Sequence, residues 1–153
     1  MTLASDDPKA QSLYRKWGMR PVVDCPYLQA KASGDGAATA IEAFPIPAAD
    51  LGHLETDLGC RFVRAGESVA AITGHSIESS LLAPGDDAVE VFGRMLNSVG
   101  INTVEVQMSE SHRAFGSFDC TETFRDTLMA TPGAQIPDPH RVTYNGDLLA
   151  IGF

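Results

Sequence analysis

The sequence is short of basic side chains and of cysteine, and both shortages exclude classes of protein. Eleven lysines and arginines stand against twenty aspartates and glutamates, which gives a formal net charge of -9. This average field repels phosphate backbones and anionic membrane surfaces, so we expect no nucleic acid and no membrane as partners. The three cysteines are far apart and odd in number, which indicates buried free thiols rather than a disulfide framework.

Signals of targeting and of several chemistries are also missing. No apolar run approaches the roughly 20 residues that span a bilayer, and the first residues lack the basic and apolar regions of a signal peptide. The four histidines and three cysteines have neither C-x-x-C nor H-x-x-x-H spacing, so we expect no metal site. Gly74-His75-Ser76 does not form the G-x-S-x-G elbow of serine hydrolases. We therefore expect a cytoplasmic protein without a metal.

The clearest pattern lies between residues 78 and 108 and predicts a strand, a helix and a second strand. Pro84-Gly85 breaks an apolar run, and Asp86 and Asp87 then supply the carboxylates that favour a helix N-terminus. Apolar residues follow at the spacing of a helix with one buried face: Ala88, Val91, Phe92, Met95, Leu96 and Val99. Because ligands of open α/β sheets bind where a strand leads into such a helix, we expect the functional site here.

The rest of the chain alternates helical and extended patterns. We expect helices at residues 8–17 and 48–58 and a partly helical segment at 111–130. We expect strands at 39–44, 60–64, 68–73, 141–144 and 147–153. Pro21 and Pro26 limit residues 19–28 to an edge strand at most. From residue 39 the order is β-α-β-β-β-α-β-α-β-β, which predicts a mixed sheet with helices on its faces, in the α+β or α/β class.

The segment from Asp7 to Met19 resembles the penultimate-helix motif of GCN5-related N-acetyltransferases (GNATs). The family form is Asn-x-x-Ala-x-x-Leu-Tyr-x-Lys-x-Gly-Phe, with Asp7 in place of Asn and Met19 in place of the aromatic residue. The matching residues are Ala10, Leu13, Tyr14, Lys16 and Gly18. The element order from residue 39 is also similar to the GNAT order, with the second helix missing.

The position of this motif bears on domain organisation. In the family the helix comes late, after the sheet that binds acetyl-CoA, whereas here it lies at the beginning. The chain therefore looks like part of a tandem GNAT protein. Residues 1–30 would be a helix and edge strand left from a preceding domain, residues 31–38 a linker, and residues 39–153 a divergent GNAT-like domain.

The resemblance implies transfer of an acetyl group from acetyl-CoA to an amine. Tyr14 matches the tyrosine that in many family members gives a proton to the departing thiolate. Glu78 lies on the strand where some members keep a glutamate that deprotonates the amine, and His75 could do the same work near neutral pH. Plainer explanations are that Tyr14 is a core aromatic of an amphipathic helix and that Glu78 faces solvent.

The same comparison points to a damaged coenzyme site. Active GNATs carry Arg/Gln-x-x-Gly-x-Gly/Ala, where backbone N–H groups hold the pyrophosphate, but residues 82–88 have one glycine and no arginine or glutamine. The resemblance assigns coenzyme contacts to Leu82, Ala83, Gly85, Ala88 and Ser109. Asp86 and Asp87 stand where the diphosphate would lie, and two like charges about 4 Å apart repel by roughly 4 kcal/mol at an effective dielectric near 20. Coenzyme binding is therefore expected to be weak.

Two functions follow from these observations. The first is a GNAT-fold protein related to acyl-CoA-dependent N-acetyltransferases, with weak or lost activity. The second is a non-catalytic interaction domain that forms a homodimer, because an amphipathic helix that exposes Trp17 needs a surface to cover it.

Overall fold

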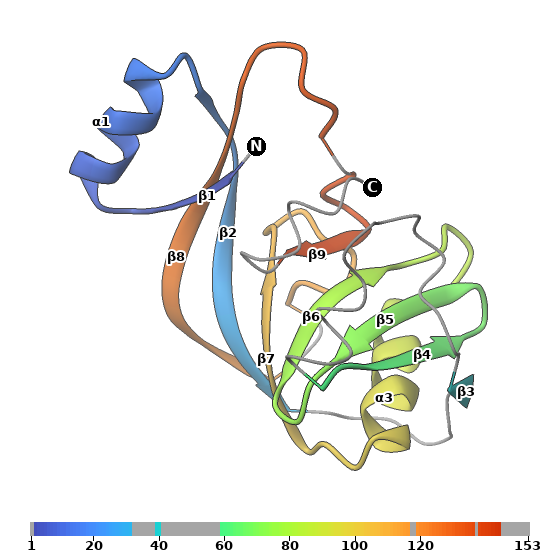
Figure 1. The fold of residues 1–153 in the computed structure, drawn as a ribbon. Coiled ribbons are helices and arrows are strands. Elements are labelled where there is room, and N and C mark those ends of the chain that lie inside the picture. Colours follow the sequence, from blue (N-terminus) through green and yellow to red (C-terminus); the bar gives the residue numbers. More distant parts are fainter. Residues whose placement is uncertain (1, 32–38, 41–58, 117–118, 137, 145–153) are drawn as a thin grey trace.

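The strands of this protein form one mixed sheet (Figure 1). The computed structural model describes residues 2–31, 39–40, 59–116, 119–136 and 138–144. In these residues nine strands lie in the order β1-β8-β2-β7-β9-β6-β5-β4-β3. They are β1 (Thr2–Ser5), β2 (Arg20–Lys31), β3 (Thr39–Ala40), β4 (Arg61–Ala65), β5 (Ser68–Ile72), β6 (Ser76–Leu81), β7 (Thr103–Met108), β8 (Cys120–Ala130) and β9 (Val142–Tyr144). The described helices are α1 (Pro8–Lys16) and α3 (Ala88–Ser98).

The unit predicted between residues 78 and 108 is confirmed as β6, α3 and β7. β6 and β7 run parallel, as strands joined by a helical crossover do. Asp87 caps α3 by accepting a hydrogen bond from the backbone N–H of Glu90 (2.9 Å). One helix face is buried through Ala88, Val91, Phe92, Met95 and Leu96, and it forms the main core with apolar residues of β4 to β7. The apolar residues whose spacing predicted this unit therefore also form its core.

Two shorter predictions are also confirmed. α1 begins at Pro8 behind Asp7, whose side chain accepts a hydrogen bond from the backbone N–H of Lys9 (2.9 Å). The strands predicted at residues 60–64 and 68–73 are the antiparallel hairpin β4–β5. Its turn contains Gly66 at a φ of 63°, a left-handed conformation that glycine adopts without strain.

The predicted partly helical segment at residues 111–130 is wrong. Residues 120–130 form strand β8, which pairs with β1 on one side and β2 on the other. Phe124 and Leu128 stand four residues apart and mimic a helical face, but three β-branched threonines, at positions 121, 123 and 127, favour the extended chain. Pairing on both sides then fixes the strand, so the expected element order is not the observed one.

Strand β2 only partly fits the expected edge strand. It is 12 residues long and lies between β8 and β7. Pro21 and Pro26 stand in the section that pairs with β8 alone, and pairing with β7 begins only at Tyr27. Because proline has no N–H to give to a second neighbour, the edge prediction is right up to Pro26 and wrong beyond it.

Several predictions fall on residues outside the described ones. These are the helix at 48–58, the linker at 31–38 apart from Lys31, the strand at 39–44 beyond β3, and the strand at 147–153. β1 and β2 belong to the same sheet as the strands from β3 to β9, and the division into domains stays a prediction. Among the described residues no helix is long and apolar enough to cross a membrane. The cytoplasmic location also stays a prediction.

Candidate functional site

The carboxylate of Asp86 fastens the turn before α3 to the β4–β5 hairpin. Its Oδ2 accepts hydrogen bonds from the backbone N–H groups of Glu67 (3.2 Å) and Ser68 (3.1 Å) and from the Ser68 hydroxyl (2.6 Å). The same hydroxyl accepts a hydrogen bond from the N–H of Ala83 (2.8 Å). A Cβ at Gly66 would lie 2.9 Å from Oδ2, so the hairpin turn fits closely around the carboxylate. The position predicted to hold an anion thus contains a carboxylate of the chain itself.

Two arginines hold the backbone carbonyl groups of this turn. Arg113 donates to the carbonyl oxygen of Ala83 (2.8 Å) and to that of Asp86. Arg141 donates through Nε to the carbonyl oxygen of Leu82 (2.6 Å), whose N–H returns a hydrogen bond to the Arg141 carbonyl (2.9 Å). Sequence reasoning missed both arginines, because they come from segments after β7 and before β9 and their acceptors are main-chain atoms.

Strand β9 lies between the far ends of β6 and β7 (Figure 1). β6 and β7 pair directly only at Ser76 and Ile77, and β9 then pairs with Ser80 and Leu81 of β6 and with the end of β7. The hydroxyl groups of Ser80 and Thr143 lie 3.0 Å apart and reinforce this contact. The two parallel strands therefore diverge, and a third strand fills the space between them.

Glu78 is buried rather than solvent-facing, with 7% of its surface exposed. It stands at an irregularity in the β5–β6 pairing, where Ala71 opposes Ser79 and Ile72 opposes Ile77, which leaves Glu78 as the extra residue of a bulge. Its Oε1 accepts a hydrogen bond from the hydroxyl of Thr73 (3.2 Å). The bulge therefore places a carboxylate inside the protein, on the strand that leads into the turn before α3.

The other predicted base, His75, lies exposed in the turn between β5 and β6. Its carbonyl accepts a hydrogen bond from the N–H of Glu105 on β7 (2.7 Å). The Glu105 carboxylate accepts from the hydroxyl of Tyr27 (2.8 Å), and burial together with this hydrogen bond raises the pKa of Tyr27 to about 12. Tyr27 and Glu105 are site neighbours that the sequence did not indicate, because they meet through pairing of β2 with β7.

Tyr14 lies in another part of the molecule. It is half-buried on α1, and its ring meets that of Trp17 edge-on at 5.7 Å between centroids. α1 lies beside β1 and reaches β8 through a hydrogen bond from Gln11 to Thr127 (3.4 Å). β8 is separated from β6 by β2 and β7, and three strand spacings amount to about 14 Å. The structure therefore does not bring Tyr14 together with Glu78 or His75.

The predicted coenzyme residues are brought together only in part. Leu82, Ala83 and Ala88 are buried at the turn and the first residue of α3, and Gly85 is exposed at the tip of the turn. Ser109 is buried after β7, where its hydroxyl lies 2.7 Å from that of Ser111 and accepts a hydrogen bond from the Ser111 N–H (3.0 Å). It closes a turn there, and residues 111–116 are not a helix.

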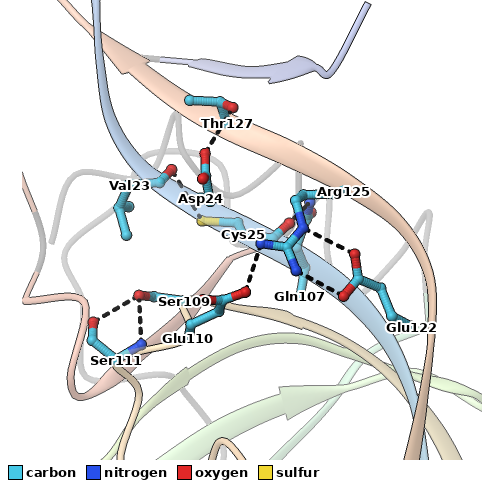
Figure 2. Close-up of polar contacts among 10 residues, drawn as sticks. All are labelled: Val23, Asp24, Cys25, Gln107, Ser109, Glu110, Ser111, Glu122, Arg125 and Thr127. Atoms are coloured by element: carbon cyan, nitrogen blue, oxygen red, sulfur yellow. Dashed lines mark hydrogen bonds and ion pairs between the residues drawn. The ribbon is translucent and has the colours of Figure 1, made fainter.

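Beside Ser109, the end of β7 and the middle of β2 and of β8 carry polar side chains that pair with one another (Figure 2). Arg125 donates to Glu110 (2.6 Å) and Glu122 (2.8 Å). Gln107 donates to Asp126 (2.8 Å). The Cys25 thiol is buried among these groups, and burial raises its pKa to about 12, with further contributions from nearby aspartates. This thiol is therefore unreactive at neutral pH.

The predicted free thiols are confirmed for Cys25 and Cys60, which are buried, and Cys120 is half-buried. Burial, followed by the Glu78 charge, raises the pKa of Cys60 to about 11. Within the residues that the structure describes, no group of histidine, cysteine, aspartate and glutamate side chains is arranged to hold a metal ion.

Comparison with solved structures finds a related fold. The chain is similar to the crystal structure of a "putative acetyltransferase" from Pyrococcus horikoshii, with a TM-score of 0.58 and 8% sequence identity. The chain therefore shares the fold of that structure. The match covers 95% of this chain and 55% of that one, so this chain spans about half the length of that protein. No protein-family model and no curated protein sequence matches.

We predict that Asp86→Ala lowers the free energy of unfolding by about 1–3 kcal/mol, because the N–H groups of Glu67 and Ser68 lose their acceptor. Urea denaturation followed by circular dichroism measures the change. Glu67→Ala is the matched control, since its side chain is exposed and lies 3.9 Å from Arg64. An Asp86→Ala protein as stable as the control would show that the carboxylate does not hold the turn.

A second prediction, which rests on His112, concerns how the stability of the protein depends on pH. Its ring is buried near Phe92, its Nδ1 accepts a hydrogen bond from the Ala114 N–H (3.1 Å), and burial lowers its pKa from 6.5 to about 4. The unfolded chain therefore binds a proton at higher pH than the folded one, and stability falls as the pH decreases from 6.5 towards 4. The full effect is about 3 kcal/mol.

Denaturation at a series of pH values tests this. His112→Gln should flatten the dependence between pH 6.5 and 4, whereas His75→Gln, at an exposed histidine, should leave it as in the wild type. Equal slopes for wild type and His112→Gln would contradict the assignment.

Proposed function

We propose that this chain belongs to an acyl-CoA-dependent N-acetyltransferase of the GNAT superfamily, which passes an acetyl group from acetyl-CoA to an amine. The acetyltransferase-like fold, matched over 95% of the chain, carries the proposal. α1 supports it, because Ala10, Leu13, Tyr14, Lys16 and Gly18 stand at the family spacing on an observed helix and its end. The parallel β6–α3–β7 unit supplies the expected coenzyme location.

In such a reaction the amine attacks the thioester carbonyl and loses a proton to a base. The tetrahedral intermediate then expels the thiolate of coenzyme A, which takes up a proton. Glu78 is our candidate for the base, because it lies on β6 of this unit and the bulge there leaves its carboxylate buried. His75 is the alternative, and its exposure in the adjacent turn would place it nearer to solvent. Tyr14 lies too far from both to act with them in one chain, so an acid role for it needs a second subunit or domain.

We further propose that the activity is weak because the turn before α3 is already occupied. The Asp86 carboxylate accepts hydrogen bonds from N–H groups of the β4–β5 hairpin. Arg113 and Arg141 donate hydrogen bonds to main-chain carbonyl groups of the turn. Asp87 caps α3 with a second carboxylate at the helix N-terminus. An incoming diphosphate would meet these negative charges at the position where a helix N-terminus otherwise attracts it.

Isothermal titration with acetyl-CoA tests the charge effect. Wild type should bind only in the millimolar range, and Asp87→Asn should bind about tenfold more tightly, because asparagine keeps the helix cap and removes one charge. Asp119→Asn, an exposed aspartate paired with Lys31, should bind as the wild type does. Micromolar binding by wild type would overturn the charge effect. No heat from either protein at millimolar ligand would overturn the acetyl-CoA proposal itself.

Thiol release from acetyl-CoA in the presence of primary amines tests the base. We predict that Glu78→Gln, which keeps the shape of the side chain, abolishes any amine-dependent release, whereas His75→Gln retains it. Loss of activity in His75→Gln alone would assign the base to His75 instead. Circular dichroism spectra should match the wild type for both variants, since a misfolded protein would lose activity for other reasons.

A further inference from the structure

The hydroxyl group of Thr73 is the centre of a buried hydrogen-bond network at the turn between β5 and β6. Thr73 directly follows β5, and Ser76 is the first residue of β6. The N–H of Ser76 donates to Oγ1 of Thr73 (3.0 Å), and the N–H of Thr73 donates to the Ser76 carbonyl oxygen (2.9 Å). Both residues are buried, as is Glu78. The main chain of the turn therefore fixes where the hydroxyl oxygen lies.

This hydroxyl has one proton and two acceptors within reach. Its oxygen lies 3.2 Å from Oε1 of Glu78 and 3.3 Å from the carbonyl oxygen of Ser76. The Ser76 carbonyl already accepts the N–H of Thr73, whereas a carboxylate is a charged acceptor and forms the stronger bond. The hydroxyl proton is therefore directed to an ionised Glu78.

The contact settles the orientation of the Glu78 carboxylate. The last torsion of a glutamate side chain is broad and does not by itself fix the plane of the carboxylate. The bulge in β6 determines where the side chain of Glu78 leaves the strand. The bond from Thr73 to Oε1 then holds one carboxylate oxygen at a point that the turn defines.

We propose that Thr73 is a positioning residue for Glu78, whose hydroxyl group holds Oε1 so that the carboxylate meets the amine in one orientation. The inference rests on the proposed function, in which Glu78 is the base. Thr73 acts only through Glu78, and a base that is misplaced by about 1 Å can cost on the order of a hundredfold in rate.

Amine-dependent thiol release from acetyl-CoA measures the role of Thr73 in catalysis. Thr73→Val, which keeps the shape of the side chain, should lower kcat about 10- to 100-fold and leave KM for acetyl-CoA within about twofold of the wild type. Thr73→Ser, which restores the hydroxyl, should return kcat to within about threefold of the wild type. A Thr73→Ser protein as slow as Thr73→Val would overturn the role of the hydroxyl.

Thr127 offers a matched control. It is buried on β8, its hydroxyl donates to Oδ1 of Asp24 (3.0 Å), and it accepts a hydrogen bond from Gln11 (3.4 Å). Thr127→Val therefore removes a bond of the same kind, between a threonine and a carboxylate, at a distance from Glu78. It should destabilise the protein without lowering kcat. A loss of kcat as large in Thr127→Val as in Thr73→Val would reduce the role of Thr73 to general stability and overturn the proposal.

A double-mutant cycle tests the contact without any activity. Thr73→Val and Glu78→Met are made singly and together, and urea denaturation gives the unfolding equilibrium constant of each protein. The effect of Thr73→Val should be about tenfold smaller when Glu78 is already replaced, because the cost to the Ser76 N–H is the same in both backgrounds and cancels. Equal effects in the two backgrounds would overturn the proposal. Coupling in a wild type that releases no thiol would instead place the failure in the N-acetyltransferase function.

Discussion

The structure around the candidate site depends on the carboxylate of Asp86. A partly buried carboxylate is stable only where donors surround it, and here two N–H groups and the hydroxyl of Ser68 do so. These bonds attach the turn before α3 to the β4–β5 hairpin, which sets where the helix begins. With the turn fixed, its carbonyl groups are in place to receive Arg113 and Arg141, and Arg141 leads directly into β9.

The same turn shows how a helix N-terminus can have its charge requirement met from within the chain. A helix N-terminus and nearby main-chain N–H groups attract negative charge whatever its source. In this chain the charge is covalently attached, so it is present at a very high local concentration and an external diphosphate must compete with it. The β6–α3–β7 unit therefore has a helix N-terminus whose negative charge the chain itself supplies, and β9 fills the divergence between its strands. Fold and chemistry are separable here, because the fold depends on buried faces and the chemistry on a few side chains in one turn.

The parts of this structure that sequence could predict are those decided by neighbouring residues. α3 follows from apolar spacing and a capping aspartate, and the β4–β5 hairpin from two extended runs around Gly66. β8 and the inner half of β2 could not be predicted, because pairing with strands far along the chain overrides their local signals of helix and of edge strand. For the site, the turn and Glu78 could be located, whereas Arg113, Arg141 and Tyr27 could not. Their partners are a main-chain carbonyl or a side chain on a distant strand, and neither leaves a pattern in the sequence.

The segment with the most specific family resemblance, α1, lies far from the candidate base. Within one chain, about 14 Å of sheet separates β8, which α1 reaches through Gln11, from the strand that bears Glu78. Tyr14 belongs to the same helical face as Leu13 and Trp17, so a contact that covers this face also covers the phenol and separates it from any thiolate. An acid role for Tyr14 therefore needs a second subunit or domain that leaves this face open.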